Sequence, residues 1–585
     1  MVFMVSVSEH KNYVLFLNIS FLFVSCAFLV LHFYTPEDFL ALSTNQNSPE
    51  INSSGKESCS SLYSLDDYKA KCFYLKSRDP CVSEGYINYL YLFCCNFGNF
   101  PLLGYFLLLL WLLVLFYLLG NTASEYFCPS LESLSKLLKL PPTIAGVTLL
   151  SLGNGAPDVF ASLVSFMGGG TCEIGLNTVL GGASFVSCVV VGIISVSLRR
   201  RRIRINKPDF VRDVCFFLLV VVCLIVVLIR DEIDVWIAIA FLAMYILYVV
   251  LVYISHIRRR NDEEVTEGHA NLSHSSDLTI PILQNMENGK LNQTEEGDVE
   301  ERSEVEVKKS RFCLGSSTCY GTLLCILEMP LCLPRRLTIP IVCEDQWSQK
   351  YAVASVTLAP LLLSTIWNHE IENETFNTYL LVYGVALIFG LAFGALASVT
   401  TEKSSPPKKC LFPWVAAGFI MSITWSYITA QELVGLLVSL GYILGVSPSL
   451  LGLTVLAWGN SLGDLMTNLT MALKGGPEGA QIAFSGCYAG PIFNILFGLG
   501  LSLVSYSWSI YPSPIVMPKD PYLMQTLAFL GAGLLWALVV LPNRDMKLDG
   551  VFGGGLVVIY IVSLSLRLIQ ALGSLQHPHV NSNQY

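Results

Sequence analysis

Two aspartates end similar stretches that lie far apart in the chain. The stretch 146–158 reads GVTLLSLGNGAPD and ends at Asp158, and the stretch 452–464 reads GLTVLAWGNSLGD and ends at Asp464. Each aspartate lies inside an apolar segment long enough to cross a bilayer, where a charged side chain costs about 3 kcal/mol or more. A carboxylate that occurs twice at this depth predicts a functional site.

The residues around each aspartate supply neutral oxygen atoms. Asn154 precedes Asp158 by one helical turn, and Asn460 and Ser461 precede Asp464 in the second copy. Carboxylates combined with amide and hydroxyl oxygens suit a hard cation such as Ca²⁺, Mn²⁺ or Na⁺. A purely structural role for the aspartates, as partners of a buried Lys or Arg, is disfavoured because no Lys or Arg lies in the middle of either segment.

Further stretches in the first half of the chain also align with stretches in the second half. The stretch 181–186 (GGASFV) aligns with 489–494 (AGPIFN), and Asn494 adds an amide at bilayer depth as a further candidate ligand. The glycines alone are equally typical of close helix packing. Upstream, Glu125 corresponds to Glu432, and both could line an entrance or be plain interfacial charges. Pro157 and the motif glycines predict helices that are broken at the site.

The composition predicts an all-α integral membrane protein. Of the 585 residues, 53% are apolar and 14% are charged, whereas a soluble domain has about 25% charged residues. Thirteen apolar runs are long enough to be transmembrane candidates. They lie at 13–33, 101–120, 141–167, 174–198, 209–229, 232–255, 351–367, 378–400, 413–436, 447–473, 480–505, 521–541 and 549–573.

These runs divide the chain into an N-terminal part and two five-helix blocks. Lys and Arg gather in alternate loops, which marks the cytosolic side and places the start of the second block opposite to that of the first. The two blocks are therefore predicted to be inverted repeats, typical of secondary transporters with a midplane site. The predicted segments are a signal peptide or signal anchor (1–33), a lumenal or extracellular Cys-containing segment (34–99), the first repeat (100–256), a cytosolic acidic loop with an interfacial Cys-rich part (257–349), two extra transmembrane helices (350–412), the second repeat (413–575) and a tail (576–585).

The two polar segments give weaker signals. Five cysteines and a sequon at Asn52 in 34–99 favour an oxidising compartment. The central loop has no EF-hand spacing and no C-x-x-C pair, so a linker and an interfacial segment are favoured there over a calcium or zinc site. We expect the protein in an endomembrane, vacuolar or ER, or in the plasma membrane rather than in the mitochondrial inner membrane, because the N-terminus lacks an Arg-rich presequence.

At the repeated motifs the sequence resembles the sodium/calcium exchanger superfamily. GNGAPD and GNSLGD are similar to its cation/calcium exchanger branch, which includes plant exchangers and the animal mitochondrial sodium/calcium exchanger, and the segments 81–95 and 127–142 add to this resemblance. The resemblance implies ten core helices, cation antiport without a catalytic residue or cofactor, and inorganic cations and the bilayer, but no nucleic acid, as partners. It also implies ion ligands at Asn154, Asp158, Asn460, Ser461, Asp464 and Asn494.

The chain departs from the superfamily at several of these positions. Asp158 and Asp464 stand where other branches have glutamate, Asn494 stands where they often have a third carboxylate, and Gly182 and Val186 replace polar ligands. We therefore expect exchange of Ca²⁺ or another divalent cation for Na⁺, K⁺ or H⁺, with fewer monovalent ions per divalent ion than in those relatives. A monovalent cation/proton exchanger, a passive cation channel and a sensor working through the acidic loop are the alternatives.

Overall fold

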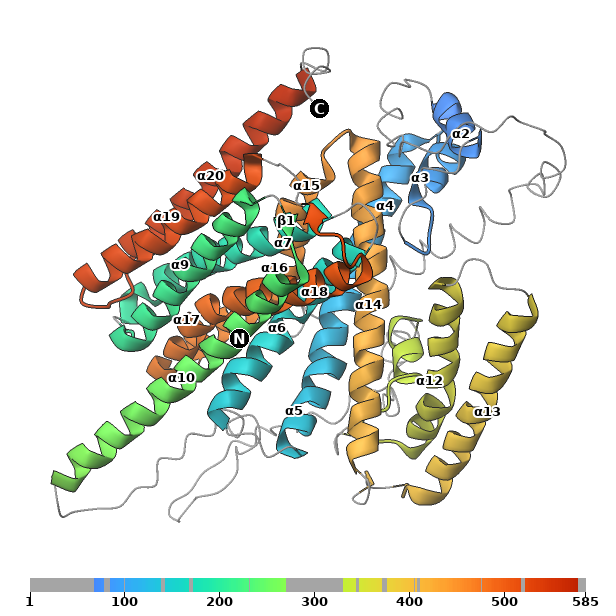
Figure 1. The fold of residues 1–585 in the computed structure, drawn as a ribbon, viewed down its shortest axis with the longest axis horizontal. Helices are drawn as coiled ribbons and strands as arrows, with labels where there is room; N and C mark the ends of the chain where they lie inside the picture. The colour runs from blue at the N-terminus through green and yellow to red at the C-terminus, as the bar shows by residue number, and fades with distance from the viewer. Residues whose placement is uncertain are drawn as a thin grey trace, which may run out of the picture.

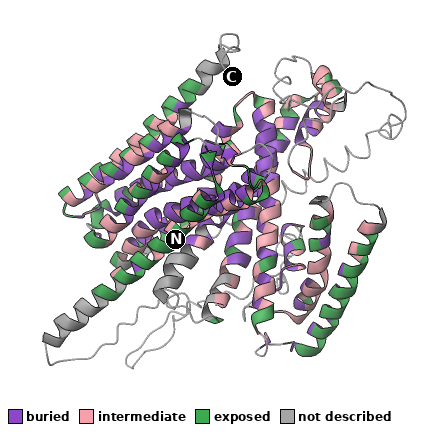
Figure 2. Ribbon diagram, in the orientation of Figure 1, coloured by how far each residue is buried: buried purple, intermediate pink, exposed green. Residues whose placement is uncertain are grey.

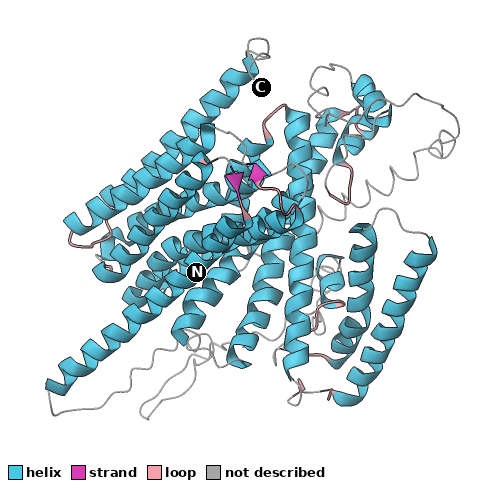
Figure 3. Ribbon diagram, viewed as in Figure 1, coloured by secondary structure: helices cyan, strands magenta, loops and turns pink. Residues whose placement is uncertain are grey.

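The computed structural model has an almost entirely helical fold (Figure 3). Its described strands, β1 (Glu232–Ile233) and β2 (Ile515–Val516), form one short antiparallel pair. The all-α prediction is confirmed. The structure describes residues 68–77, 85–98, 100–137, 142–167, 172–201, 203–230, 232–269, 330–342, 347–370, 376–403, 406–407, 411–474, 476–516 and 521–576.

Ten helices of the described chain are long and apolar enough to cross a membrane. The helices that carry the two motifs are not among these ten, and with them twelve of the thirteen predicted spans coincide with described helices. The remaining predicted span, 13–33, lies outside the described residues. The elements of the first repeat are α4 (Pro101–Thr122), η3 (Ala123–Phe127), α5 (Cys128–Leu137), α6 (Pro142–Met167), α7 (Cys172–Ser184), η4 (Phe185–Val190), α8 (Val191–Leu198), η5 (Arg199–Arg201), α9 (Lys207–Ile229) and α10 (Val235–His269). Those of the second are α14 (Leu411–Leu444), α15 (Pro448–Leu451), η8 (Gly452–Leu456), α16 (Ala457–Lys474), α17 (Gly476–Phe493), η9 (Asn494–Leu499), α18 (Gly500–Ser509), α19 (Pro521–Asn543) and α20 (Gly550–Gln576).

The two repeats run in opposite directions. Arg204, just before α9, bridges to Lys547, just after α19, while the strand that follows α9 pairs with the strand that precedes α19. The fourth helices of the two repeats are therefore antiparallel, as the charge pattern predicts. We call the end with the Arg204–Lys547 bridge the inner end and the end with the β1–β2 pair the outer end.

The core lies where the repeats interlock (Figure 2). A large apolar cluster joins α6 to α10 with α16 to α20, and its fully buried members include Leu180, Val191 and Leu496. The helices approach closely at their small residues, since a Cβ on Gly181 would lie 2.4 Å from the carbonyl oxygen of Leu453. This packing fixes the motif helix of each repeat against the other repeat.

Two helices between the repeats lie apart from this core. α12 (Gln349–Glu370) and α13 (Phe376–Thr400) pack on each other (Figure 1). Most described residues of α13 are exposed, whereas most of those of α12 are half-buried (Figure 2). They correspond to the two extra helices predicted at 350–412. Residues 330–342 of the central loop pack beside η3 and α14, where Arg335 and Ile339 are buried.

The motif helices differ from the expectation in one respect. α6 is continuous through Gly153 and Asp158 with Pro157 inside it, and α15, η8 and α16 follow one another without a break. The prediction of broken helices at the motif is therefore wrong for these residues. Irregularity takes the form of π-helical turns in η8, η4 and η9, because such a turn accommodates an extra residue without ending the helix.

Candidate cation site

Asp158 and Asp464 lie on two helices, α6 and α16, that pack against each other. Asp158 lies on α6 and is 2% exposed, and Asp464 lies on α16 and is 7% exposed. The two carboxylates are close enough for the charge of one to act on the other, and the side chain of Asn460 lies beside Asp158. The inverted repeats thus bring together two acidic groups that are widely separated in the sequence.

Asn494 completes the contact between the repeats. Its Nδ2 donates a hydrogen bond of 2.6 Å to Oδ2 of Asp158. Gly155 makes this approach possible, because a Cβ there would lie 2.2 Å from Oδ1 of Asn494. Gly155, the second glycine of the GNGAPD motif, therefore has a steric role that the sequence spacing alone did not reveal.

Gly182 on α7 leaves a space in the site. A Cβ at this position would lie 3.3 Å from Oγ of Ser461 and 3.5 Å from Oδ2 of Asp158. Four residues further along, Val186 is buried and brings no oxygen atom. At Gly182 and Val186 the third core span of the first repeat therefore shapes the site without supplying a side-chain ligand.

Several polar atoms at this position have no hydrogen-bond partner among the described residues. They are Oδ1 of Asp158, both amide atoms of Asn460, Oγ of Ser461 and Oδ1 of Asn494. A buried polar group without a partner costs about 1–3 kcal/mol, so five of them together indicate a site built to receive a ligand. Asn154 lies on α6 within the same motif, but its side chain is outside the described residues.

The chemistry of these atoms favours a bare or partly hydrated cation. All but one of the unpartnered atoms are oxygens, and no ion pair joins either aspartate to a Lys or Arg of the described chain. The described residues also contain no cluster of three His, Cys, Asp or Glu side chains. Two carboxylates with amide and hydroxyl oxygens form a hard donor set, which can accept one divalent or two monovalent cations at zero net charge.

Comparison with known proteins agrees with this arrangement. The family model "Sodium/calcium exchanger protein" matches residues 108–254 and 414–569, which contain both motifs and Asn494. The chain belongs to the sodium/calcium exchanger family. The exchanger is 52% identical over 560 residues to cation/calcium exchanger 2 of Arabidopsis thaliana, covering 95% of this chain and 98% of that protein. It is 30% identical over 550 residues to a mitochondrial sodium/calcium exchanger protein of Rattus norvegicus, covering 89% and 91%.

Solved structures match the exchanger at much lower identity. The H⁺/Ca²⁺ exchanger CAX is 12% identical, with a TM-score of 0.39, over 87% of this chain and 95% of that one. A sodium-calcium exchanger structure is 13% identical, with a TM-score of 0.36, over 78% and 98%.

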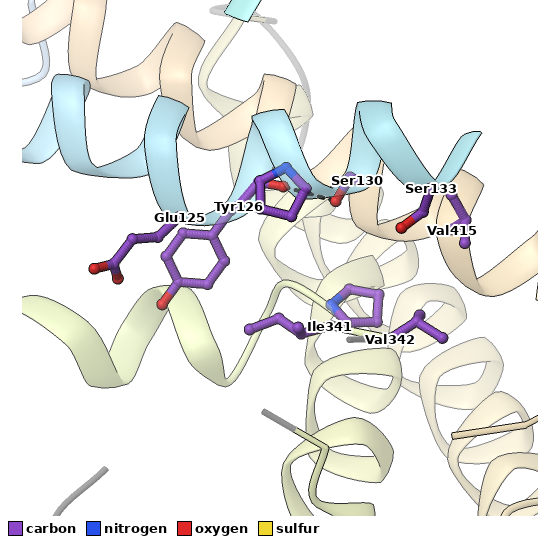
Figure 4. Close-up of a pocket in the computed structure, with 9 residues that line it drawn as sticks. Glu125, Tyr126, Ser130, Ser133, Ile341, Val342 and Val415 are labelled. Atoms are coloured by element: carbon purple, nitrogen blue, oxygen red, sulfur yellow. Dashed lines mark hydrogen bonds between the residues drawn. The ribbon is translucent and has the colours of Figure 1, made fainter. Parts of the chain in front are cut away.

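The two repeated glutamates have different surroundings. Glu125 is exposed and lines a small pocket at the inner end, together with Tyr126, Ser130 and residues 340–342 (Figure 4). Glu432 is buried near the outer end, where the backbone N–H of Tyr86 and the hydroxyl of Tyr89 both donate to its carboxylate. Because it is buried, Glu432 fits neither of the two roles left open, whereas the exposed Glu125 fits both.

A buried polar network on α9 escaped prediction from the sequence. Asp213 pairs with Arg212 at 2.8 Å and accepts hydrogen bonds from Tyr248 on α10 and Ser485 on α17, at 3.1 and 2.8 Å. The acid lies near the end of an apolar run and therefore resembles an interfacial charge in the sequence. Its role is to join the fourth and fifth helices of the first repeat to the helix that leads to Asn494.

Proposed function

We propose that the exchanger is a secondary active antiporter that moves Ca²⁺, or another divalent cation such as Mn²⁺, in exchange for Na⁺, K⁺ or H⁺. The observation that carries this proposal is the buried pair Asp158 and Asp464, surrounded by polar atoms that lack partners. The printed names of its relatives, cation/calcium exchangers and a mitochondrial sodium/calcium exchanger, support Ca²⁺ as one of the ions.

Competition at one site would couple the ions. An empty site leaves two charges in a low-dielectric interior, whereas one divalent or two monovalent cations neutralise both. A change of access is therefore easiest when the site is occupied. Energy would come from the gradient of the counter-ion, and no covalent step or cofactor is needed.

Alternating access explains the enclosure of the site better than an open pore does. Asp158, Ser461 and Asn494 are all buried, so in the described chain the site is closed by packed side chains. A passive channel would instead keep a hydrated path past its selectivity residues. Exchange of a monovalent cation for protons remains the second candidate, because Asn494 is neutral and the site has only two carboxylates.

The compartment is also part of the proposal. The disulfide Cys72–Cys95 supports a lumenal or extracellular position for 34–99, since such bonds persist on the oxidising side of a membrane. We therefore propose an endomembrane or plasma-membrane location, with the basic inner loops in the cytosol.

Flux measurements on purified protein test the function directly. Proteoliposomes loaded with isotopic Ca²⁺ should release it when Na⁺, K⁺ or a proton gradient is supplied outside, and should retain it in the absence of a counter-ion. Release that needs no counter-ion, with unitary currents in a planar bilayer, would instead establish the channel.

A further inference from the structure

The N-terminal side of the first repeat carries a docked segment at the outer end. It contains α2 (Tyr68–Ser77), α3 (Tyr89–Tyr91) and η2 (Leu92–Asn96), and the disulfide Cys72–Cys95 joins the first of these to the last (Figure 1). Phe93 fixes the segment on α4, since a Cβ at Gly104 would lie 2.8 Å from its ring. The segment is thus packed onto the transmembrane helices rather than tethered beside them.

One hydroxyl group of this segment connects the first helices of both repeats. Tyr89 donates to Oε2 of Glu432 on α14 and accepts a hydrogen bond of 2.8 Å from Nε1 of Trp111 on α4. The backbone N–H of Tyr86 donates to the other oxygen of Glu432. We call these four residues, Tyr86, Tyr89, Trp111 and Glu432, the outer latch.

The latch is well shielded from solvent. Tyr89 is 0% exposed and Glu432 is 7% exposed. Burial, and next the neighbouring Glu432 carboxylate, raises the pKa of Tyr89 well above its ordinary value, so the hydroxyl keeps its proton and remains a donor. Hydrogen bonds to a charged acceptor are stronger than those between neutral groups.

Both helices joined by the latch also contact a motif helix. On α14, Leu433 and Val434 belong to the same buried cluster as Ala156 and Phe160, which flank Asp158 on α6. On α4, the ring of Phe116 lies where a Cβ of Gly459 would be, 2.1 Å away, so it packs directly on the residue before Asn460. Each end of the latch is therefore one layer of packing from the cation site.

We propose that Tyr89 and Glu432 are positioning residues for ion exchange, which hold the outer halves of α4 and α14 together and so control how readily the site opens to the outer side. The inference rests on the proposed antiport, because a buried ion can leave outward only if packing on that side loosens. Glu125, the inner counterpart of Glu432, is exposed and lies outside any such latch. The latch thus favours states closed to the outer side, and a variant that lacks it shifts the population toward outward opening.

The test compares Tyr89→Phe with Tyr91→Phe, a matched change in the same short helix that removes a hydroxyl outside the latch. Hydrogen–deuterium exchange reports on the latch without requiring transport. We expect faster exchange in the outer half of α14 for Tyr89→Phe and no change for Tyr91→Phe. Equal protection in both variants and wild type would overturn the latch itself.

Ion flux from each face then tests the positioning role. Loss of one hydrogen bond to a charged group should lower the outer-face KM for Ca²⁺ relative to the inner-face KM by about fivefold or more, since apparent affinity follows the accessible fraction. Glu432→Gln should show the same split, and combining it with Tyr89→Phe should add little further. If hydrogen–deuterium exchange shows that α14 is loosened but both KM values are unchanged, or change equally, the latch only anchors the N-terminal segment that contains α2, α3 and η2. Absence of ion flux in wild type would refute the proposed function. The hydrogen–deuterium exchange measurement would then still show whether the latch holds α14.

Discussion

Asn494→Asp probes the charge count of the site with a nearly isosteric side chain. The amide of Asn494 lies 2.6 Å from Oδ2 of Asp158, so the variant places a second carboxylate against the first. At an effective dielectric constant of about 20, two unit charges at this separation repel by about 6 kcal/mol. The new carboxylate must therefore hold a proton or recruit a further cation.

The consequence is a change in the charge moved per cycle. Wild type, with two carboxylates, is expected to exchange one Ca²⁺ for two monovalent ions and to be nearly insensitive to voltage. With three carboxylates, three monovalent ions can replace one Ca²⁺, and one net charge crosses the membrane. Since a unit charge gains about 2.3 kcal/mol per 100 mV, the limiting Ca²⁺ gradient should change about 50-fold over that range.

Ca²⁺ flux in proteoliposomes is the assay, with the membrane potential set by an ion that the exchanger does not carry. The matched control is Asn494→Ser, which changes the same residue but leaves two carboxylates and should therefore stay insensitive to voltage. A steep voltage dependence in wild type would refute the charge count. So would an Asn494→Asp variant that still transports and stays insensitive to voltage when the pH is raised until the new carboxylate ionises.

Three further predictions follow from the site and its supports. Asp158→Asn and Asp464→Asn should each reduce exchange to background while expression is maintained, because removing a buried charge does not hinder insertion; near-normal flux in either would place the site elsewhere. Gly182→Ser should move its side chain into the space beside Ser461 and alter the ratio of the Ca²⁺ to Na⁺ KM values at least about threefold, whereas an unchanged ratio would show that the space takes no ion or water. Asp213→Asn should lower stability by about 2 kcal/mol, less than for a fully buried pair because Arg212 is partly exposed, and this should appear as a lower Tm in detergent with ion selectivity retained.

The repeat architecture could be predicted well from the sequence. Its signals are local or periodic: apolar runs of membrane length, alternating basic loops and a motif that occurs twice. In a bilayer every backbone polar group must be satisfied within the protein, so such runs have little choice but to form helices. The same constraint makes a membrane-buried aspartate or asparagine conspicuous, and the sequence for that reason predicts Asp158, Asp464 and Asn494 as candidate ligands.

Tertiary structure alone decided how these residues act on one another. Whether Asn494 donates to Asp158, whether Gly182 faces the site, and whether Glu432 is buried all depend on contacts between elements hundreds of residues apart. Helices at the motif remain continuous because packing across the repeats tolerates a proline that local propensity opposes. Tyr89 and Asp213 carried no signal in the sequence, since a tyrosine in a polar segment and an acid near a helix end are ordinary there. Their roles arise only because folding surrounds them with partners and removes the water that would otherwise satisfy them.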